Sequence, residues 1–126
     1  MVYLLAAAGG ALGALARWGV AEAMSGPPGG WPWATLQVNL TGCLLIGVLL
    51  GVLGALSPEP AWARPFLGAG FLGGYTTYST FAVDVVQMAQ DGALVGAAGY
   101  VLVSVLGGVA GVAAGVLAGR KVVAAR

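Results

Sequence analysis

Residues 73–81 combine the side chains best suited to chemistry in this sequence. Two glycines are followed by seven consecutive residues that are all aromatic or hydroxylic: Tyr75, Thr76, Thr77, Tyr78, Ser79, Thr80 and Phe81. Glycine weakens a helix and threonine hydroxyls compete for backbone hydrogen bonds, so this order predicts a local break in a helix. At membrane depth, broken backbone is tolerated only where protein buries it or where it lines a cavity. The segment is therefore the strongest candidate site, ahead of the alternative that its rings simply fill a core.

Two further polar positions lie in otherwise apolar stretches. Asn39 follows Thr35 by four residues, and Ser104 follows Tyr100 by four, which places each pair on one helix face. A buried polar group without a partner costs a few kcal/mol, so each needs either a structural partner or a function. The structural alternatives are an inter-helix hydrogen bond for Asn39 and, for Ser104, a bond to the carbonyl four residues earlier.

These side chains suit a small anion. Asn39, Thr80 and Ser104 can donate hydrogen bonds, and Tyr78 and Phe81 lie three residues apart, so both can present the partly positive edges of their rings. A carbonyl exposed at the break would suit a small cation instead. Because the sequence has no carboxylate near the middle of this segment, a cation-conducting pore is disfavoured. The spacing does not identify the ion.

Composition indicates the environment in which these residues work. The chain has 126 residues, of which 60% are hydrophobic and 7% charged, against roughly 25% charged residues in average soluble domains. The bilayer must therefore be its solvent. With no histidine and one cysteine, the chain lacks the residues of a zinc site, a His-based triad or a disulfide framework. A net charge of +1 and short basic runs exclude nucleic-acid binding. We predict that the protein is not an enzyme of these classes.

Charges and turn residues divide the chain into four apolar stretches, and a membrane-spanning helix needs about 20 residues. The expected spans are about 2–24, 34–56, 65–90 and 93–118. The loops between them are too short for an extramembrane domain, so we predict one all-α integral membrane domain over 1–126, with the third helix broken at mid-membrane. A removable signal peptide is not expected, because no Lys or Arg precedes the first apolar stretch.

Four spans place both termini on one side of the membrane. That side would carry Arg64, Arg120, Lys121 and Arg126, and the other at most Arg17. The positive-inside rule then predicts cytoplasmic termini.

Glycines recur at four-residue spacing, as in the pairs Gly9–Gly13 and Gly47–Gly51 and in the run Gly107, Gly111, Gly115, Gly119. This spacing favours close helix packing within one subunit over a subunit interface. Four short helices are too few to enclose an ion pathway completely. We therefore expect at least a dimer.

Three blocks of the sequence, residues 9–18, 39–42 and 70–81, resemble the CrcB/Fluc family of fluoride channels. The third block, Gly-Phe-Leu-Gly-Gly-Tyr-Thr-Thr-Tyr-Ser-Thr-Phe, is the most specific. The resemblance implies a four-helix subunit in an antiparallel, dual-topology homodimer, with two fluoride pores along the subunit interface. It also implies passive export of fluoride from the cytoplasm across the inner (plasma) membrane.

The resemblance also implies roles for individual residues. A structural sodium ion would be held by the backbone carbonyls of Gly73 and Thr76. The fluoride pathway and its vestibule would use Asn39, Thr80 and Ser104, with Tyr100 nearby, the aromatic pair Tyr78 and Phe81, and Arg17. Two departures stand out, because Tyr78 replaces the usual phenylalanine and Gly108 replaces a second small hydroxyl residue.

One expectation conflicts with another. An antiparallel dimer of identical chains must insert in both orientations, yet the basic residues favour one. Either this bias is too weak to decide, which we favour, or the chain pairs with an oppositely oriented paralogue.

Two other functions compete with a channel. A small multidrug-resistance-type proton antiporter needs a membrane-embedded carboxylate, whereas the first span has only Glu22, near its end. A non-transporting packing subunit of a larger complex would explain the glycines but not the Thr and Tyr cluster.

Overall fold

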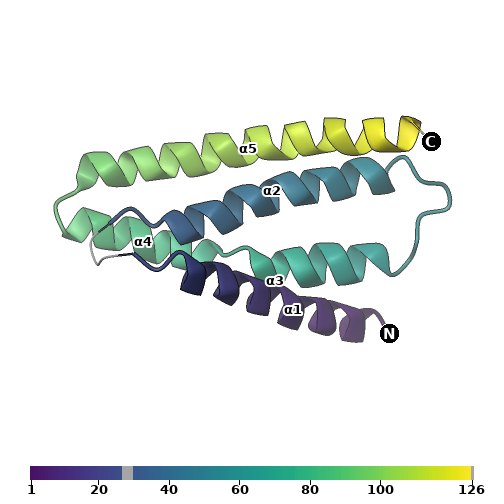
Figure 1. Ribbon diagram of the computed structural model, residues 1–126, viewed down its shortest axis with the longest axis horizontal. Coiled ribbons are helices and arrows are strands. Elements are labelled where there is room, and N and C mark those ends of the chain that lie inside the picture. Colours follow the sequence, from purple (N-terminus) through teal and green to yellow (C-terminus); the bar gives the residue numbers. More distant parts are fainter. Residues whose placement is uncertain (27–29, 126) are drawn as a thin grey trace.

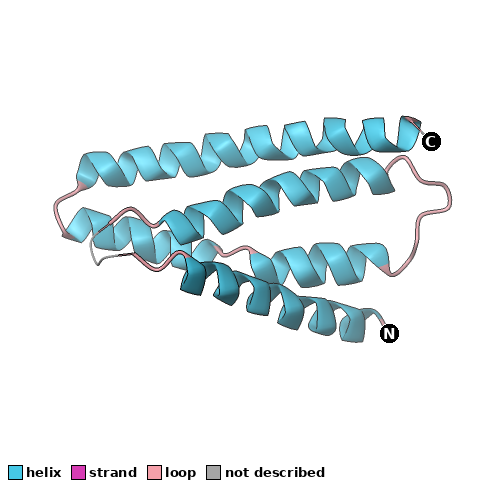
Figure 2. Ribbon diagram, viewed as in Figure 1, coloured by secondary structure: helices cyan, strands magenta, loops and turns pink. Residues whose placement is uncertain are grey.

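The computed structural model of the chain describes residues 1–26 and 30–125, and within these ranges every regular element is a helix (Figures 1 and 2). The elements are α1 (Val2–Ala23), α2 (Trp33–Leu53), η1 (Arg64–Leu72), α3 (Gly73–Tyr75), α4 (Tyr78–Gln90) and α5 (Leu94–Ala124). The prediction of an all-α protein is confirmed.

Three of these helices, α1, α2 and α5, are long and apolar enough to cross a membrane. The stretch expected to form the third crossing, 65–90, contains η1, α3 and α4 in succession. The last helix continues to Ala124, past the end expected near residue 118. The helix extends beyond the membrane-spanning part expected at 93–118, and Gly119 does not stop it. This glycine packs instead against the Val48 carbonyl of α2, where only a residue without a side chain fits.

The helices lie roughly along one direction, and both termini lie at the same end of the molecule (Figure 1). The turn between α2 and η1 is also at this end, whereas the turn between α4 and α5 is at the other (Figure 1). An even number of crossings would place the termini in this way.

Helices α2 and α5 pack side by side and run in the same direction (Figure 1). Each helix presents glycines to backbone carbonyls of the other, and a Cβ atom on any of them would collide with its partner. The pairs are Gly47 with Val112, Gly51 with Val116, Gly115 with Leu44 and Gly119 with Val48. The four-residue glycine spacing therefore serves packing within one subunit, as the sequence favours.

Helix α1 packs on η1 and α3 in the same way, with glycines against backbone carbonyls of the neighbouring segment. A Cβ on Gly9 would collide with the Phe66 carbonyl, and one on Gly13 with the Phe71 carbonyl. The η1 segment has wide π-type turns, which are rare and frequent at functional sites. Its first turn contains Pro65, which has no N–H to satisfy. Together these contacts hold the segment that precedes residues 76 and 77 firmly against α1.

Candidate functional site

Helical backbone stops at Tyr75 and resumes at Tyr78. Thr76 and Thr77 between them are extended, with φ and ψ of −80° and 160° for Thr76 and of −147° and 120° for Thr77. The Thr76 hydroxyl donates to the Leu72 carbonyl at 2.9 Å. The Thr77 hydroxyl accepts from the backbone N–H of Thr80 at 3.2 Å and so caps the start of α4. Hydroxyl groups thus satisfy backbone atoms on both sides of the interruption.

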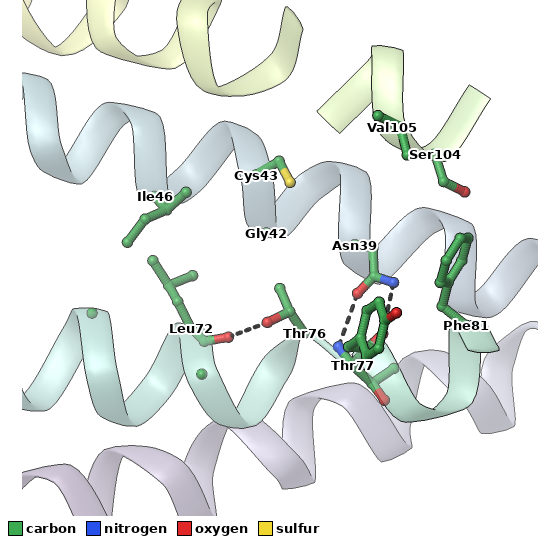
Figure 3. Close-up of a pocket in the computed structure, with 13 residues that line it drawn as sticks. Asn39, Gly42, Cys43, Ile46, Leu72, Thr76, Thr77, Phe81, Ser104 and Val105 are labelled. Atoms are coloured by element: carbon green, nitrogen blue, oxygen red, sulfur yellow. Dashed lines mark hydrogen bonds between the residues drawn. The ribbon is translucent and has the colours of Figure 1, made fainter. Parts of the chain in front are cut away.

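Asn39 of α2 bonds to the extended backbone through both ends of its amide. Its Oδ1 accepts from the Thr77 N–H and its Nδ2 donates to the Thr77 carbonyl, each at 2.9 Å (Figure 3). The amide therefore makes the inter-helix bond that was the structural alternative for this residue. A primary amide has two N–H donors, so one N–H remains available for a further acceptor.

The interruption changes which backbone carbonyls have partners. In a continuous helix the Thr77 N–H would donate to the Gly73 carbonyl, but here it donates to Asn39. The Thr76 carbonyl accepts from Nη1 of Arg17, on α1, at 3.2 Å. The Arg17 side chain is therefore hydrogen-bonded to the extended segment between α3 and α4.

A cavity of about 450 Å³ lies beside the interruption, between α2, the start of α4 and α5. Its polar and aromatic wall consists of Asn39, Thr76, Thr77, Tyr78, Phe81 and Ser104. Figure 3 labels Asn39, Thr77, Phe81 and Ser104 among the residues that line this space. The Tyr78 side chain is 81% exposed, so the cavity is open on that side.

Ser104 differs from the other polar groups in this wall. Its Oγ is buried and has no hydrogen-bond partner among the described residues. The alternative in which it bonds to the carbonyl four residues earlier is therefore wrong. Leaving a buried hydroxyl unsatisfied costs about 1–3 kcal/mol, so the Ser104 hydroxyl is a candidate donor to a polar ligand.

One helical turn after Ser104, the backbone of Gly108 is covered by Cys43. A Cβ atom at Gly108 would lie 3.2 Å from the Cys43 Sγ, closer than side chains normally approach. The thiol thus occupies the space in which a larger residue at position 108 would have to fit. A side chain at position 108 would therefore require the Cys43 thiol to shift by a few tenths of an ångström.

A second cavity, of about 400 Å³, lies on the α1 side of the interruption. Its polar wall consists of Arg17, Thr35, Thr77, Ser79 and Thr80. The structure thus divides the predicted pathway residues between two cavities. Asn39, Tyr78, Phe81 and Ser104 line the first, Arg17 and Thr80 line the second, and Thr77 lines both.

Tyr100 is completely buried and lines neither of these cavities. Its hydroxyl donates to Oδ2 of Asp84 at 3.3 Å, and the Thr35 side chain reaches the same phenol. The Tyr100 ring lies behind Phe81, with 5.3 Å between ring centroids. The sequence analysis did not assign Thr35 or Asp84 to the site. The available signal was that Asp84 is the one carboxylate in the expected third span.

Comparison with known proteins gives consistent matches. The family model described as CrcB-like protein, Camphor Resistance (CrcB), matches residues 4–116. A protein of Nocardia farcinica named Fluoride-specific ion channel FluC 2 is 41% identical over 94% of this chain and 85% of its own length. Proteins named Fluoride-specific ion channel FluC from Bordetella avium and Paracoccus denitrificans are 48% and 42% identical. These alignments cover 83% and 94% of this chain, and 82% and 94% of the relatives.

Proposed function

Because the chain belongs to the CrcB family, we propose that it is a fluoride-specific ion channel, which makes it a transport protein rather than an enzyme. It is a multi-pass membrane protein, and its membrane is the inner (plasma) membrane. Fluoride leaves the cytoplasm through it passively, down its own gradient. The names of relatives that align over most of their length support this function.

The observation that carries the assignment of the site is the unsatisfied hydroxyl of Ser104 in the wall of the first cavity. Fluoride is a small, strongly hydrated anion, and moving such an ion out of water without replacement contacts costs tens of kcal/mol. Ser104 and the free N–H of Asn39 replace water as hydrogen-bond donors. The ring edges of Tyr78 and Phe81, whose centroids are 6.1 Å apart, add weaker positive contacts.

The second cavity acts as the vestibule from which fluoride approaches. Arg17 supplies positive charge there, and Thr35, Ser79 and Thr80 supply hydroxyl donors. The hydroxyls replace part of the hydration shell. Because Arg17 also donates to the Thr76 carbonyl, its charge is held close to the interruption.

The working unit is an antiparallel homodimer surrounded by lipid, and the third crossing of each subunit is broken at mid-membrane. Two observations support the second copy. The first cavity is open on the side of Tyr78, and a partner surface there would complete its wall. The glycine stripes are already used within the subunit, so the partner contacts a different face. An oppositely oriented paralogue could occupy the same position.

A structural sodium ion at the centre of this dimer is compatible with the residues present. Within 1–26 and 30–125 there is no group of three His, Cys, Asp or Glu side chains that could hold a metal, so the ligands would be backbone carbonyls. The Gly73 carbonyl has lost the donor it would have in a continuous helix. The Thr76 carbonyl accepts from Arg17 and keeps a second lone pair. Two carbonyls from each subunit would hold the ion and fix the two interruptions to each other.

Neither competing function is favoured. A proton antiporter needs a carboxylate that faces the transported ion, whereas the Asp84 carboxylate accepts from the buried Tyr100. A packing subunit would leave the unsatisfied Ser104 hydroxyl without a role.

Fluoride efflux from liposomes tests the function. Purified protein is reconstituted into fluoride-loaded vesicles, and release is followed with an ion-selective electrode. We expect rapid release that needs only a charge-balancing ionophore. Ser104→Ala removes one donor and should slow release about tenfold, the effect of one weakened hydrogen bond of roughly 1.4 kcal/mol.

Ser25→Ala is the matched control, since it makes the same change at an exposed hydroxyl that donates to the Glu22 carbonyl. It should release fluoride at the wild-type rate. Release that depends on a proton gradient would instead indicate an antiporter. No release at all would leave the packing subunit as the better explanation.

A further inference from the structure

Five aromatic rings form an unbroken series from the segment before α2 to the first cavity. The centroid distances are 5.4 Å for Trp33–Trp31, 5.9 Å for Trp31–Tyr100, 5.3 Å for Tyr100–Phe81 and 6.1 Å for Phe81–Tyr78. All of these fall within the range in which aromatic pairs attract each other. The last two rings, Phe81 and Tyr78, line the cavity. Trp31 is thus connected to the two rings at the cavity through Tyr100.

Trp31 packs against α5 and against the buried ring of Tyr100. Its indole lies over two glycines of α5, with Nε1 3.7 Å from a Cβ built on Gly96 and Cζ2 3.8 Å from one built on Gly99. It meets Tyr100 edge-on, with 73° between the ring planes. Tyr100 has no exposed surface, and the Trp31 ring is one of the groups packed against it.

The Tyr100 hydroxyl is held by two polar side chains, Asp84 and Thr35. Its one side-chain hydrogen bond to a carboxylate, to Asp84, is 3.3 Å long, at the weak end of the range. Its ring contacts two other rings, Trp31 and Phe81. Without the indole, water would reach the phenol and compete for Asp84, and the ring behind Phe81 would be free to turn.

We propose that Trp31 is a positioning residue of the fluoride pathway, which holds Phe81 in place through Tyr100. This inference rests on the proposed channel function. A ring edge that replaces part of the hydration shell of a small ion must keep its position closely, because sites lose selectivity when their supporting contacts loosen. Trp31 touches neither cavity, so its effect on the ion is entirely indirect.

The test compares Trp31→Ala, Trp31→Phe and Trp33→Ala in liposomes and in planar bilayers. Trp33 is the matched control, because it is 58% exposed and its ring contacts Trp31 but not Tyr100. Two quantities are measured: the rate of fluoride release, and the reversal potential between fluoride and chloride. The reversal potential reports selectivity and does not depend on how much protein is folded.

We expect Trp31→Ala to slow fluoride release about tenfold and to shift the reversal potential toward that of chloride. Trp31→Phe keeps a ring against Tyr100 and should restore most of the selectivity. Trp33→Ala should match the wild type in both quantities. In a Tyr100→Leu background, Trp31→Ala should cause little further change, because residues that act through one another are not additive.

Wild-type rate and reversal potential in Trp31→Ala would overturn the inference while leaving the channel function intact. So would a fall in rate with an unchanged reversal potential and no rescue by Trp31→Phe, since that pattern indicates a role in folding alone. Additive effects of Trp31→Ala and Tyr100→Leu would also overturn it. Absence of fluoride release from the wild type would overturn the channel function itself.

Discussion

Asn39 fixes the conformation of a residue on another segment of the chain, because both ends of its amide bond to the backbone of Thr77. An extended residue between two helices has a free N–H and a free carbonyl. Both would be costly in lipid, where water cannot satisfy them. The side chain of α2 thus makes the interruption stable and at the same time brings one N–H to the first cavity.

Asn39→Asp should therefore nearly abolish fluoride release. One carboxylate oxygen could still accept from the Thr77 N–H, but the other would face the Thr77 carbonyl where Nδ2 now donates at 2.9 Å. The new charge would also repel an anion in the cavity. We expect release to fall about a hundredfold, the effect of roughly 3 kcal/mol, with the dimer retained on gel filtration.

Gln37→Glu is the control for that variant, since it makes the same amide-to-carboxylate change at an exposed position of α2. It should leave release unchanged. Normal release from Asn39→Asp would remove Asn39 from the pathway.

At the level of residues, the sequence identified side chains but not their partners. Asn39, Tyr78, Phe81 and Ser104 stood out as polar or aromatic residues in apolar surroundings, and they line one cavity. The bond of Arg17 to the Thr76 carbonyl spans 59 positions in the chain, and no local pattern encodes it. The same is true of the contact between Tyr100 and Asp84.

At the level of elements, glycine positions determine how closely helices approach. Gly115 lies between the Leu44 carbonyl and the Val48 N–H of α2, so that a Cβ atom would collide with the former and lie 2.7 Å from the latter. Backbone atoms cannot move aside as the tip of a flexible side chain can. The α2–α5 pair therefore tolerates no side chain at this position.

Gly115→Val should destabilise the protein by about 1–3 kcal/mol, as overpacking does elsewhere. Thermal unfolding in detergent, followed by tryptophan fluorescence and gel filtration, measures this change. Ala114→Val adds bulk at the exposed neighbouring position of α5 and should unfold at the wild-type temperature. Equal stability of the two variants would contradict the packing described for α2 and α5.

The elements were predictable to different degrees. The apolar stretches indicated α1, α2 and α5 because length and hydropathy suffice for such helices. The π-type turns of η1 were not predicted, since Pro65 and the glycines of 64–72 are equally compatible with an ordinary helix. The continuation of α5 to Ala124 could not be predicted from the expected span, because a glycine near a helix end resembles a stop signal, whereas Gly119 serves packing.

At the level of the whole molecule, charge is distributed unevenly between its two ends. Arg64, Arg120 and Lys121 belong to the end that holds both termini (Figure 1). Within the connecting turn, Arg64 donates to both carboxylate oxygens of Glu59, at 2.6 and 3.0 Å. This hydrogen bond lowers the pKa of Glu59 below its ordinary value. In the turn, the positive charge of Arg64 is therefore neutralised by Glu59. Arg120 and Lys121 are exposed.

Antiparallel assembly of identical chains predicts that the termini lie on both sides of the membrane. In a Cys43→Ser background, a single cysteine placed at Ala125 should react with a membrane-impermeant maleimide to about half completion in sealed vesicles, since the two insertions are equally populated. Permeabilising the vesicles should complete the reaction and serves as the control. All-or-none labelling before permeabilisation would indicate one fixed orientation and therefore an oppositely oriented partner.

Thr77 belongs to the walls of both cavities. The two cavities therefore share one residue of their walls, and its hydroxyl lies 3.3 and 2.9 Å from the hydroxyls of Ser79 and Thr80. Thr77 is buried, and its hydroxyl also accepts from the backbone N–H of Thr80. A substitution at Thr77 would therefore alter the walls of both cavities at once.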